Sequence, residues 1–389
     1  MHVSIIGGGI GGLSVAIALE RLGFDYDVYE QASSFQPIGS AIGLGSNAML
    51  ALRTLGVGES VLQEGMPLHE QRFIDEQWNE LNRVYLSSWN DAFGEETITI
   101  QRADLHEALY DALPKPNLHL NARLIDFKKR KHLYELQFAN GKKQTTDIII
   151  AADGIHSLIR QAVAPHSKKR YSGYTCWRGI AKNKDDIPLH ISHEAWSTKG
   201  RIGWAPMSKG NAYWFACINA QPDEPNFKRW KQEDVAHHFS FLGPVVERMI
   251  AETPDHYFLH HDLYDVQPLQ TFVYDRIVLL GDAAHATTPN MGQGAGQAIE
   301  DAFFLYRVLK KYPSIEEAFR VYDEYRVPKT KKVTELSRFI GWASQWESPF
   351  WTSLRNKIFQ RIPTQFLLNR LHFLFKDQKK KGAKVPLSF

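Results

Sequence analysis

The sequence predicts an α/β fold in which a mostly β domain is inserted into a parallel-sheet domain and a helical segment ends the chain. Three observations predict it: a strand, glycine turn, helix and strand at the N-terminus, two later apolar strands that each end in an Asp–Gly or Gly–Asp pair, and a run of short aromatic-rich strands between these two. At 389 residues the chain is long enough for two closely packed domains.

The N-terminal unit carries a dinucleotide-binding fingerprint. Residues 3–6 form an apolar strand, followed by Gly7, Gly9 and Gly12, a helix of apolar period and a second strand that ends at Glu30. Gly7 permits a tight turn, Gly9 lets the main chain approach a pyrophosphate, and Gly12 lets helix and strand pack closely. Glu30 is placed to accept hydrogen bonds from a ribose, and the helix N-terminus offers N–H groups to phosphates. The unit predicts a Rossmann-type domain, and leaves FAD or NAD open.

A second motif lies in residues 147–160, where a buried strand ends at Asp153-Gly154 and a helix is expected to start near Ser157, with Arg160 in its first turns. This segment has two readings. It is either a ligand-binding turn or an ordinary strand–turn–helix in which Asp153 and Ser157 cap the helix.

A third motif follows another apolar strand, which ends at Asp282. A loop with Pro289 comes next, then Gly292 and Gly294, and a helix that is expected to begin near Ala295. The helix N-terminus would point at an electron-rich group, and Asp282 is well placed to bind a ligand hydroxyl. The alternative is a glycine-rich loop needed only for close packing.

These motifs, in this order, resemble the class A flavoprotein monooxygenases, the family of para-hydroxybenzoate hydroxylase, salicylate hydroxylase and FAD-dependent urate hydroxylase. The resemblance covers residues 1 to about 345, and every signature position of G-x-G-x-x-G, D-G-x-x-S-x-x-R, G-D and P-x-x-G-Q-G is matched. It implies FAD as the cofactor. Independently, no second G-x-G-x-x-G follows a strand, so one domain must hold the flavin while NADH or NADPH docks transiently.

The resemblance also implies roles for single residues. Glu30 then holds the adenosine ribose, Asp282 contacts the ribityl chain, and Asp153 belongs to a motif that serves both FAD and NAD(P)H. Arg102 matches an arginine that reaches the FAD phosphates or ribityl chain; the alternative is an exposed charge beside a helix start. Pro289 and its neighbours then border the reaction cavity, and the following helix stabilises negative charge on the pyrimidine end of reduced flavin.

The middle of the chain is rich in aromatic residues and short β-like runs, which predicts a mostly β substrate domain. The predicted boundaries are 1–72, 98–168 and 270–340 for the FAD-binding domain, 73–97 and 169–269 for the substrate domain, and 341–389 for a C-terminal helical segment with a basic tail.

The segment RIGWAPMSKGNAYWFA looks like a hairpin of the family's urate hydroxylases, in which an arginine and a tyrosine with the spacing of Arg201 and Tyr213 face the substrate. On one face of adjacent strands, Arg201 would pair with an anionic or carbonyl-bearing substrate and Tyr213 would relay a proton. We predict both as catalytic residues. The alternative is a cross-strand tyrosine and a solvated arginine.

The resemblance implies an FAD-dependent monooxygenase that uses NAD(P)H and O₂, through a flavin C4a-hydroperoxide, to hydroxylate a small electron-rich aromatic or heteroaromatic substrate. Two alternatives stay open. One is an FAD-dependent epoxidase that acts on a lipophilic substrate, and the other is a flavin-binding regulatory protein without turnover.

Composition excludes several other classes. Cys176 and Cys217 form no C-x-x-C pair, and the 16 histidines show no ligand-like spacing, so neither a dithiol centre nor a metal site is expected. The net charge is +3, but nine Lys/Arg and one Asp lie from residue 350 onward, against 37 and 42 before it. An acidic body disfavours nucleic-acid binding. No secretory signal features or membrane-spanning run are present, which predicts a cytoplasmic protein. The expected assembly is a monomer or a homodimer.

The C-terminal segment has apolar residues at helical spacing, and Pro363 is expected to break it into two helices. Its expected role is a cap over the two-domain core, followed by a solvated basic end. The alternative is an amphipathic tail attracted to anionic lipid, which would suit a lipophilic substrate drawn from a membrane.

Overall fold

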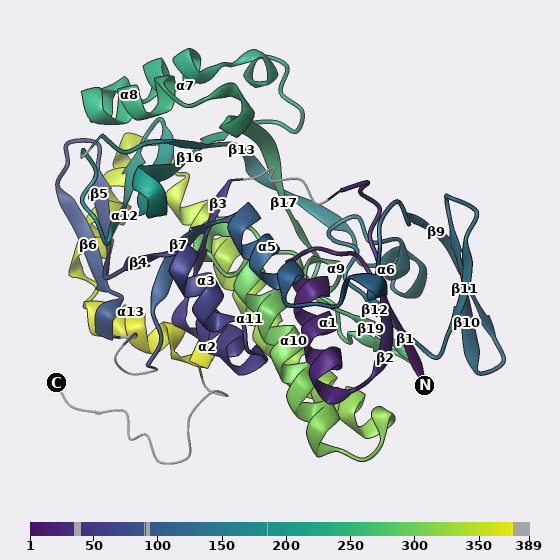
Figure 1. The fold of residues 1–389 in the computed structure, drawn as a ribbon. Coiled ribbons are helices and arrows are strands. Elements are labelled where there is room, and N and C mark those ends of the chain that lie inside the picture. Colours follow the sequence, from purple (N-terminus) through teal and green to yellow (C-terminus); the bar gives the residue numbers. More distant parts are fainter. Residues whose placement is uncertain (35–39, 89, 91–93, 185, 376–389) are drawn as a thin grey trace.

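The computed structural model describes residues 1–34, 40–88, 90, 94–184 and 186–375. A six-stranded sheet with its helices lies at one end of the molecule, and a seven-stranded sheet lies at the other, beside the helices α7 and α8 (Figure 1). The predicted α/β fold class is confirmed.

The six-stranded sheet is mainly parallel, with strand order β18-β19-β12-β1-β2-β8. Its central pairs β1–β2, β1–β12 and β12–β19 are parallel, and β18 is antiparallel to β19. The strands are β1 (His2–Ile6), β2 (Asp25–Tyr29), β8 (Leu118–His119), β12 (Ile148–Ala151), β18 (Val273–Tyr274) and β19 (Ile277–Leu279).

The first strand, helix and second strand form because their apolar residues are buried on both sides. Helix α1 starts after Gly9 and ends at Gly23, whose φ of 71° gives a left-handed C-cap. Helix α1 packs against α10, and the residues from Gly12 to Leu19 are buried. The helices of this domain are α1 (Ile10–Leu22), α2 (Ser46–Leu55), α3 (Gly58–Glu64), α5 (Arg102–Asp111), α6 (Leu158–Val163), α9 (Asp282–His285), α10 (Gly294–Lys311) and α11 (Ile315–Ser344).

Two three-stranded antiparallel sheets accompany this domain. One, β11-β10-β9, stands away from the body at the edge of the molecule (Figure 1). The strands are β3 (Ala41–Leu44), β4 (Met66–Leu68) and β7 (Thr97–Gln101) in one sheet, and β9 (Leu124–Arg130), β10 (Leu133–Phe138) and β11 (Lys143–Thr146) in the other.

The seven-stranded sheet has the order β17-β13-β16-β15-β14-β5-β6. On one face, Trp177, Trp204 and Trp214 form a core with α7 and α8. The elements are β5 (Glu70–Asp75), β6 (Glu80–Tyr85), β13 (Lys169–Lys182), β14 (Ile191–Ser197), β15 (Gly200–Met207), β16 (Asn211–Asn219), β17 (Leu259–Val266), α7 (Gln232–His238) and α8 (Pro244–Ala251). The exact domain boundaries stay a prediction.

The C-terminal helices are α12 (Pro349–Arg361) and α13 (Thr364–Leu371), so the break at Pro363 is confirmed. Both pack on β6, where the Asn82 side-chain amide donates to the Phe359 and Ile362 carbonyls at 2.7 and 3.0 Å. Among the described residues, no helix is both long and apolar enough to cross a bilayer. The short 3₁₀ helices are Lys115–Asn117, Ser208–Gly210, Phe227–Arg229, Ser240–Leu242, Asp255–Tyr257, Pro289–Met291 and His372–Phe375.

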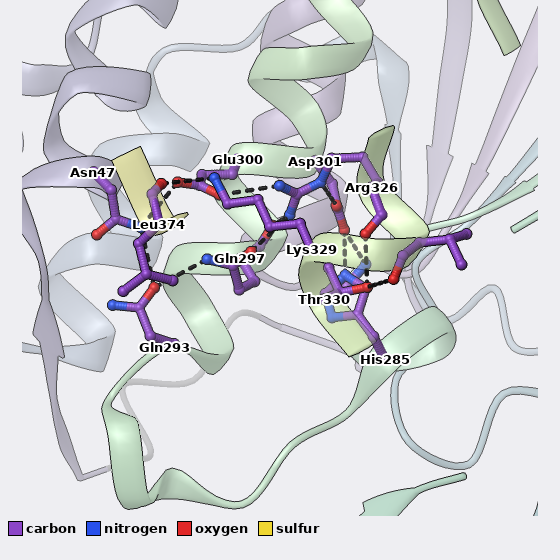
Figure 2. Close-up of polar contacts among 12 residues, drawn as sticks. Asn47, His285, Gln293, Gln297, Glu300, Asp301, Arg326, Lys329, Thr330 and Leu374 are labelled. Carbon is purple, nitrogen blue, oxygen red and sulfur yellow. Dashed lines mark hydrogen bonds and ion pairs between the residues drawn. The ribbon is translucent and has the colours of Figure 1, made fainter. Parts of the chain in front are cut away.

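A buried ion-pair network joins α10 to α11 (Figure 2). Arg326 Nε lies 2.6 Å from Asp301 Oδ1, and its Nη1 lies 3.0 Å from Glu300 Oε2. Lys329 Nζ contacts Glu300 at 2.9 Å and also donates to the Leu374 carbonyl at 2.7 Å. The network therefore ties the C-terminal segment to the helix that begins at the third motif.

Candidate active site

The glycine turn between β1 and α1 has three glycines with different tasks. A Cβ on Gly7, whose φ is 106°, would lie 2.3 Å from the Ala152 carbonyl oxygen, and a Cβ on Gly12 would lie 1.9 Å from the Gly7 oxygen. Both sites therefore require glycine for packing. A Cβ on Gly9 would meet no described atom within 4 Å, because Gly9 faces an open cavity. This is the close main-chain approach that a pyrophosphate needs.

The side chains of Glu30 and His106 both contact the main chain of this turn at Gly8. The Gly8 N–H donates to Glu30 Oε2 at 2.7 Å, and the Ala32 N–H donates to Oε1 at 2.9 Å. His106 Nε2 lies 2.7 Å from the Gly8 carbonyl oxygen. The carboxylate of Glu30 is thus fixed at the end of β2, where the fingerprint expects a ribose ligand.

The second and third motifs lie against each other. Asp153 Oδ2 accepts from the Leu158 N–H at 2.9 Å, so Asp153 caps α6 together with Ser157. Arg160 is buried and donates to the carbonyls of Ala283, at 3.1 Å, and Ile155. These contacts of Asp153 are those expected of a helix cap in an ordinary strand–turn–helix. The hydrogen bond of Arg160 to Ala283 connects the second motif to the third.

Asp282 heads the short helix α9 and faces the same cavity as Gly9. Its side chain is exposed to this cavity. The surrounding protein desolvates the carboxyl and raises its pKa, opposed by the positive charges of His285, Arg102 and Arg160. The third motif then turns through Gly292, with φ 61°, into the N-terminus of α10.

A single cavity of about 2110 Å³ joins these motifs to the seven-stranded sheet. Ligand pockets usually measure about 300–1,000 Å³, so this one has room for a dinucleotide and a second molecule. The predicted site residues that line it are Gly9, Arg102, Arg201, Tyr213, Asp282, Pro289, Gly292, Gly294 and Ala295. Those outside its lining are Gly7, Gly12, Glu30 and Asp153.

The polar network of Figure 2 connects α10 to the start of the third motif. Asp301 Oδ2 accepts from the Gly281 N–H at 2.8 Å and contacts His285 Nε2 at 2.6 Å. Burial alone would raise the pKa of Asp301, but His285 and Arg326 lower it to about 2. His285 is therefore held by Asp301, and this contact favours a structural role for His285.

Arg201 and Tyr213 lie on the same face of adjacent strands. Arg201 on β15 is opposite Cys217, and Tyr213 on β16 is opposite Ala205, so four residues separate them along the strand. At about 3.3 Å per residue this is roughly 13 Å. Both side chains line the cavity from opposite ends of one face, and a ring between them would be within reach of both.

The guanidinium of Arg201 is almost fully buried at 1% exposure and is held in place from two sides. Its Nη1 donates to Glu194 Oε1 at 3.1 Å, and its Nη2 donates to Asn290 Oδ1. Its Nε is buried with no hydrogen-bond partner among the described residues. Because buried N–H groups are almost always paired, this donor is one that a bound molecule or a water would satisfy.

Tyr213 keeps its proton at neutral pH. Burial raises the pKa of the phenol, and the nearby Arg178 and Arg201 only partly oppose the rise. Arg178 also faces the cavity, and it helps to lower the pKa of the adjacent Cys176 thiol. Tyr213 can therefore donate a hydrogen bond to a substrate oxygen or nitrogen without ionising.

Several residues at the Arg201 end of the cavity were not predicted from the sequence. Asn290 joins three elements, since its amide nitrogen donates to Tyr174 Oη at 2.9 Å and to the Ser337 carbonyl at 2.7 Å. Arg355 of α12 lies over the Trp196 ring, 5.0 Å from its centroid, and also lines the cavity. The position of Asn290 next to Pro289 in the third motif could have indicated a site residue. Nothing in the sequence around Arg355 or Glu194 indicates one.

A dinucleotide turn, a helix N-terminus and a buried arginine lie around one cavity, an arrangement that fits an enzyme with a bound dinucleotide. Residues 1–337 match the model of the FAD binding domain family. The chain belongs to this family, binds FAD, and is an FAD-dependent monooxygenase of the class A flavoprotein hydroxylases.

Individual relatives cover almost the whole chain. The aurachin C monooxygenase/isomerase of Stigmatella aurantiaca is 33% identical over 365 residues, which are 93% of this chain and 94% of that protein. The 2-heptyl-3-hydroxy-4(1H)-quinolone synthase of Pseudomonas aeruginosa strain PAO1 is 30% identical, over 93% and 94%. The solved structure of Klebsiella pneumoniae HpxO with FAD and uric acid matches with a TM-score of 0.88 at 26% identity, over 96% and 97%.

Proposed function

We propose that this enzyme uses NADH or NADPH and O₂ to hydroxylate an electron-rich, nitrogen-containing heteroaromatic ring. One observation carries the proposal: the buried guanidinium of Arg201, with its free Nε, lies in the same cavity as the glycine turn. The names of the relatives support the substrate class, because they include a quinolone synthase and a protein crystallised with uric acid.

Bound FAD would supply the redox chemistry, in which NAD(P)H, O₂, a proton and the ring give NAD(P)⁺, water and the hydroxylated ring through the C4a-hydroperoxide. Gly9 and the N–H groups at the start of α1 would hold the pyrophosphate, Glu30 the adenosine ribose, and Asp282 with Arg102 the ribityl chain. Pro289 to Ala295 would border the isoalloxazine. The Asp153 motif would serve both nucleotides.

The protein groups at the substrate end would position the ring and stabilise its charge. Arg201 would bind a ring oxygen and stabilise negative charge on it as the ring loses a proton. Tyr213 would donate a hydrogen bond from the opposite end. Phe359 of α12 stacks on Trp196 with centroids 4.8 Å apart, and both rings line the cavity.

The test measures NADH and NADPH oxidation by the FAD-loaded enzyme against phenols, hydroxybenzoates, urate, 6-hydroxynicotinate and 2-heptyl-4(1H)-quinolone, with ¹⁸O₂ and mass spectrometry of the product. One ring that stimulates oxidation and gains one ¹⁸O atom is the expected result. An epoxide product would favour the lipophilic-substrate epoxidase. If NAD(P)H does not reduce the flavin in the presence of any of these rings, the result would favour the regulatory protein.

With that substrate, Arg201→Gln should lower kcat/KM by about 10- to 150-fold, the loss of a hydrogen bond to a charged group. Tyr213→Phe should lower it by roughly tenfold. Arg229→Gln and Tyr85→Phe are matched controls on exposed side chains. Flavin content and melting temperature of each variant separate a lost contact from a lost fold, and unchanged kcat/KM in both active-site variants would remove these residues from the mechanism.

A further inference from the structure

Aromatic rings form a continuous chain on the surface at the end of α11 and the start of α12. Neighbouring ring centroids lie 5.8 Å apart for Phe339–Trp342, 5.0 Å for Trp342–Trp346, 6.1 Å for Trp346–Trp351 and 5.1 Å for Phe350–Trp351. Four of the five side chains are more than half exposed, from 52% for Trp351 to 69% for Phe350. We call these five residues the aromatic patch.

Further apolar side chains extend the patch along α12 and α13. Leu354, Ile358 and Phe366 are 39%, 54% and 48% exposed. Of the fourteen large apolar side chains exposed among the described residues, seven lie between residues 339 and 366. The opposite face of α12, with Thr352 and Arg355, is buried against the protein. Soluble monomers rarely expose such a contiguous apolar surface unless something binds there.

The segment that carries the patch is rich in basic residues. Residues 331–389 hold 12 Lys/Arg and 3 Asp/Glu, whereas residues 1–330 hold 34 and 40. Exposed members within the described residues are Lys331, Lys332, Lys357, Arg361 and Arg370. Five more lysines follow residue 375 in the sequence. An apolar helical face together with an excess of basic residues is the composition of a segment that lies on an anionic membrane surface.

A second copy of the chain fits this surface less well. In a two-fold dimer the patch would face itself. The basic segments of both copies would then be brought together, and like charges across an interface are unfavourable. Tryptophan, moreover, is enriched at the boundary between lipid headgroups and acyl chains. Charge and composition therefore favour an anionic bilayer as the occupant.

The patch also borders the active-site cavity. Phe339, Trp342, Trp346, Ile358 and Phe366 are among the residues that line this cavity. We propose that the aromatic patch docks the enzyme on an anionic lipid bilayer, with the mouth of the active-site cavity facing the lipid. Entry of a lipophilic ring substrate by this route rests on the proposed function, but the docking itself does not.

The test is flotation of the full-length, FAD-loaded enzyme with vesicles of phosphatidylcholine alone or mixed with phosphatidylglycerol. We expect at least a tenfold larger bound fraction on the anionic vesicles, decreasing in high salt because exposed charges are screened. Phe350→Ser with Trp351→Ser should reduce binding at least tenfold. These two side chains lie outside the cavity lining, so flavin content and NAD(P)H oxidation in solution should not change.

Leu133→Ser with Leu189→Ser is the matched control, since both side chains are exposed, by 39% and 58%, far along the chain from the patch. This control should bind anionic vesicles like the wild type. Absence of flotation, equal binding to both vesicle types, or wild-type binding by the Phe350/Trp351 variant would overturn the proposal. If the wild type is a dimer and the Phe350/Trp351 variant is a monomer, the patch would instead be an interface with a second copy of the chain. Flotation needs no substrate, so its failure is distinguishable from failure of the proposed function.

Discussion

Gly9 offers a direct test of where the FAD pyrophosphate lies, through the substitution Gly9→Ala. The backbone of Gly9, with φ −75° and ψ −176°, is accessible to alanine. The new methyl group would meet no described atom within 4 Å. The apoprotein should therefore keep its stability or gain about 0.4–1 kcal/mol, because alanine restricts the unfolded chain.

The holoprotein should respond differently. A methyl group placed in a filled site costs about 1–3 kcal/mol, which corresponds to FAD binding weakened by about 5- to 150-fold. The measurement is quenching of FAD fluorescence on titration of the apoprotein, together with its melting curve by circular dichroism.

Gly12→Ala is the contrasting variant, because its Cβ would lie 1.9 Å from the main-chain oxygen of Gly7. It should destabilise the apoprotein itself. Wild-type affinity of Gly9→Ala for FAD would show that the pyrophosphate does not approach this residue, and would refute the reading of the cavity as an FAD site at that end.

Three further predictions concern the interior. Arg326→Met leaves Glu300 and Asp301 buried with one fewer cation. The free energy of unfolding should therefore decrease by about 3–5 kcal/mol, and the melting temperature should decrease by about 5 °C. An unchanged melting curve would contradict this role of Arg326. Asn290→Ala removes the amide that holds Arg201, so kcat/KM should fall about tenfold while FAD affinity is unchanged; equal losses in both would indicate a general disturbance of the loop. Burial, assisted by Arg72, lowers the pKa of His193 to about 4. The unfolded chain therefore binds a proton that the folded chain does not, and unfolding free energy should fall by about 3 kcal/mol as pH drops from 6.5 towards 4, a slope that His193→Gln should reduce in denaturant titrations.

The parts of the fold that local chemistry decides were predictable from the sequence. The glycine turn, the helices after Ser157 and Gln293, and the break at Pro363 each depend on residues a few positions apart. The shared face of Arg201 and Tyr213 was also predictable, because a short turn joins their strands and fixes their register.

The rest of the site depends on contacts between distant segments. Strand β5 pairs in parallel with β14 across more than a hundred residues, and nothing near residue 70 announces that partner. Asn290 reaches Tyr174 and Ser337 only after three elements have packed together. Arg355 looks like any surface arginine in an amphipathic helix, and its burial follows from the docking of α12, which the sequence does not specify.

The C-terminal helices have an evolutionary consequence. The family match ends at residue 337, whereas α12 and α13, residues 349–371, supply part of the cavity wall. Mutations in this wall can change the size and polarity of the substrate end without touching the glycine turn or the helix behind the flavin. Selection for a new ring substituent can therefore act on a segment that carries no nucleotide-binding duty, which allows relatives with one cofactor site to diverge in what they oxidise.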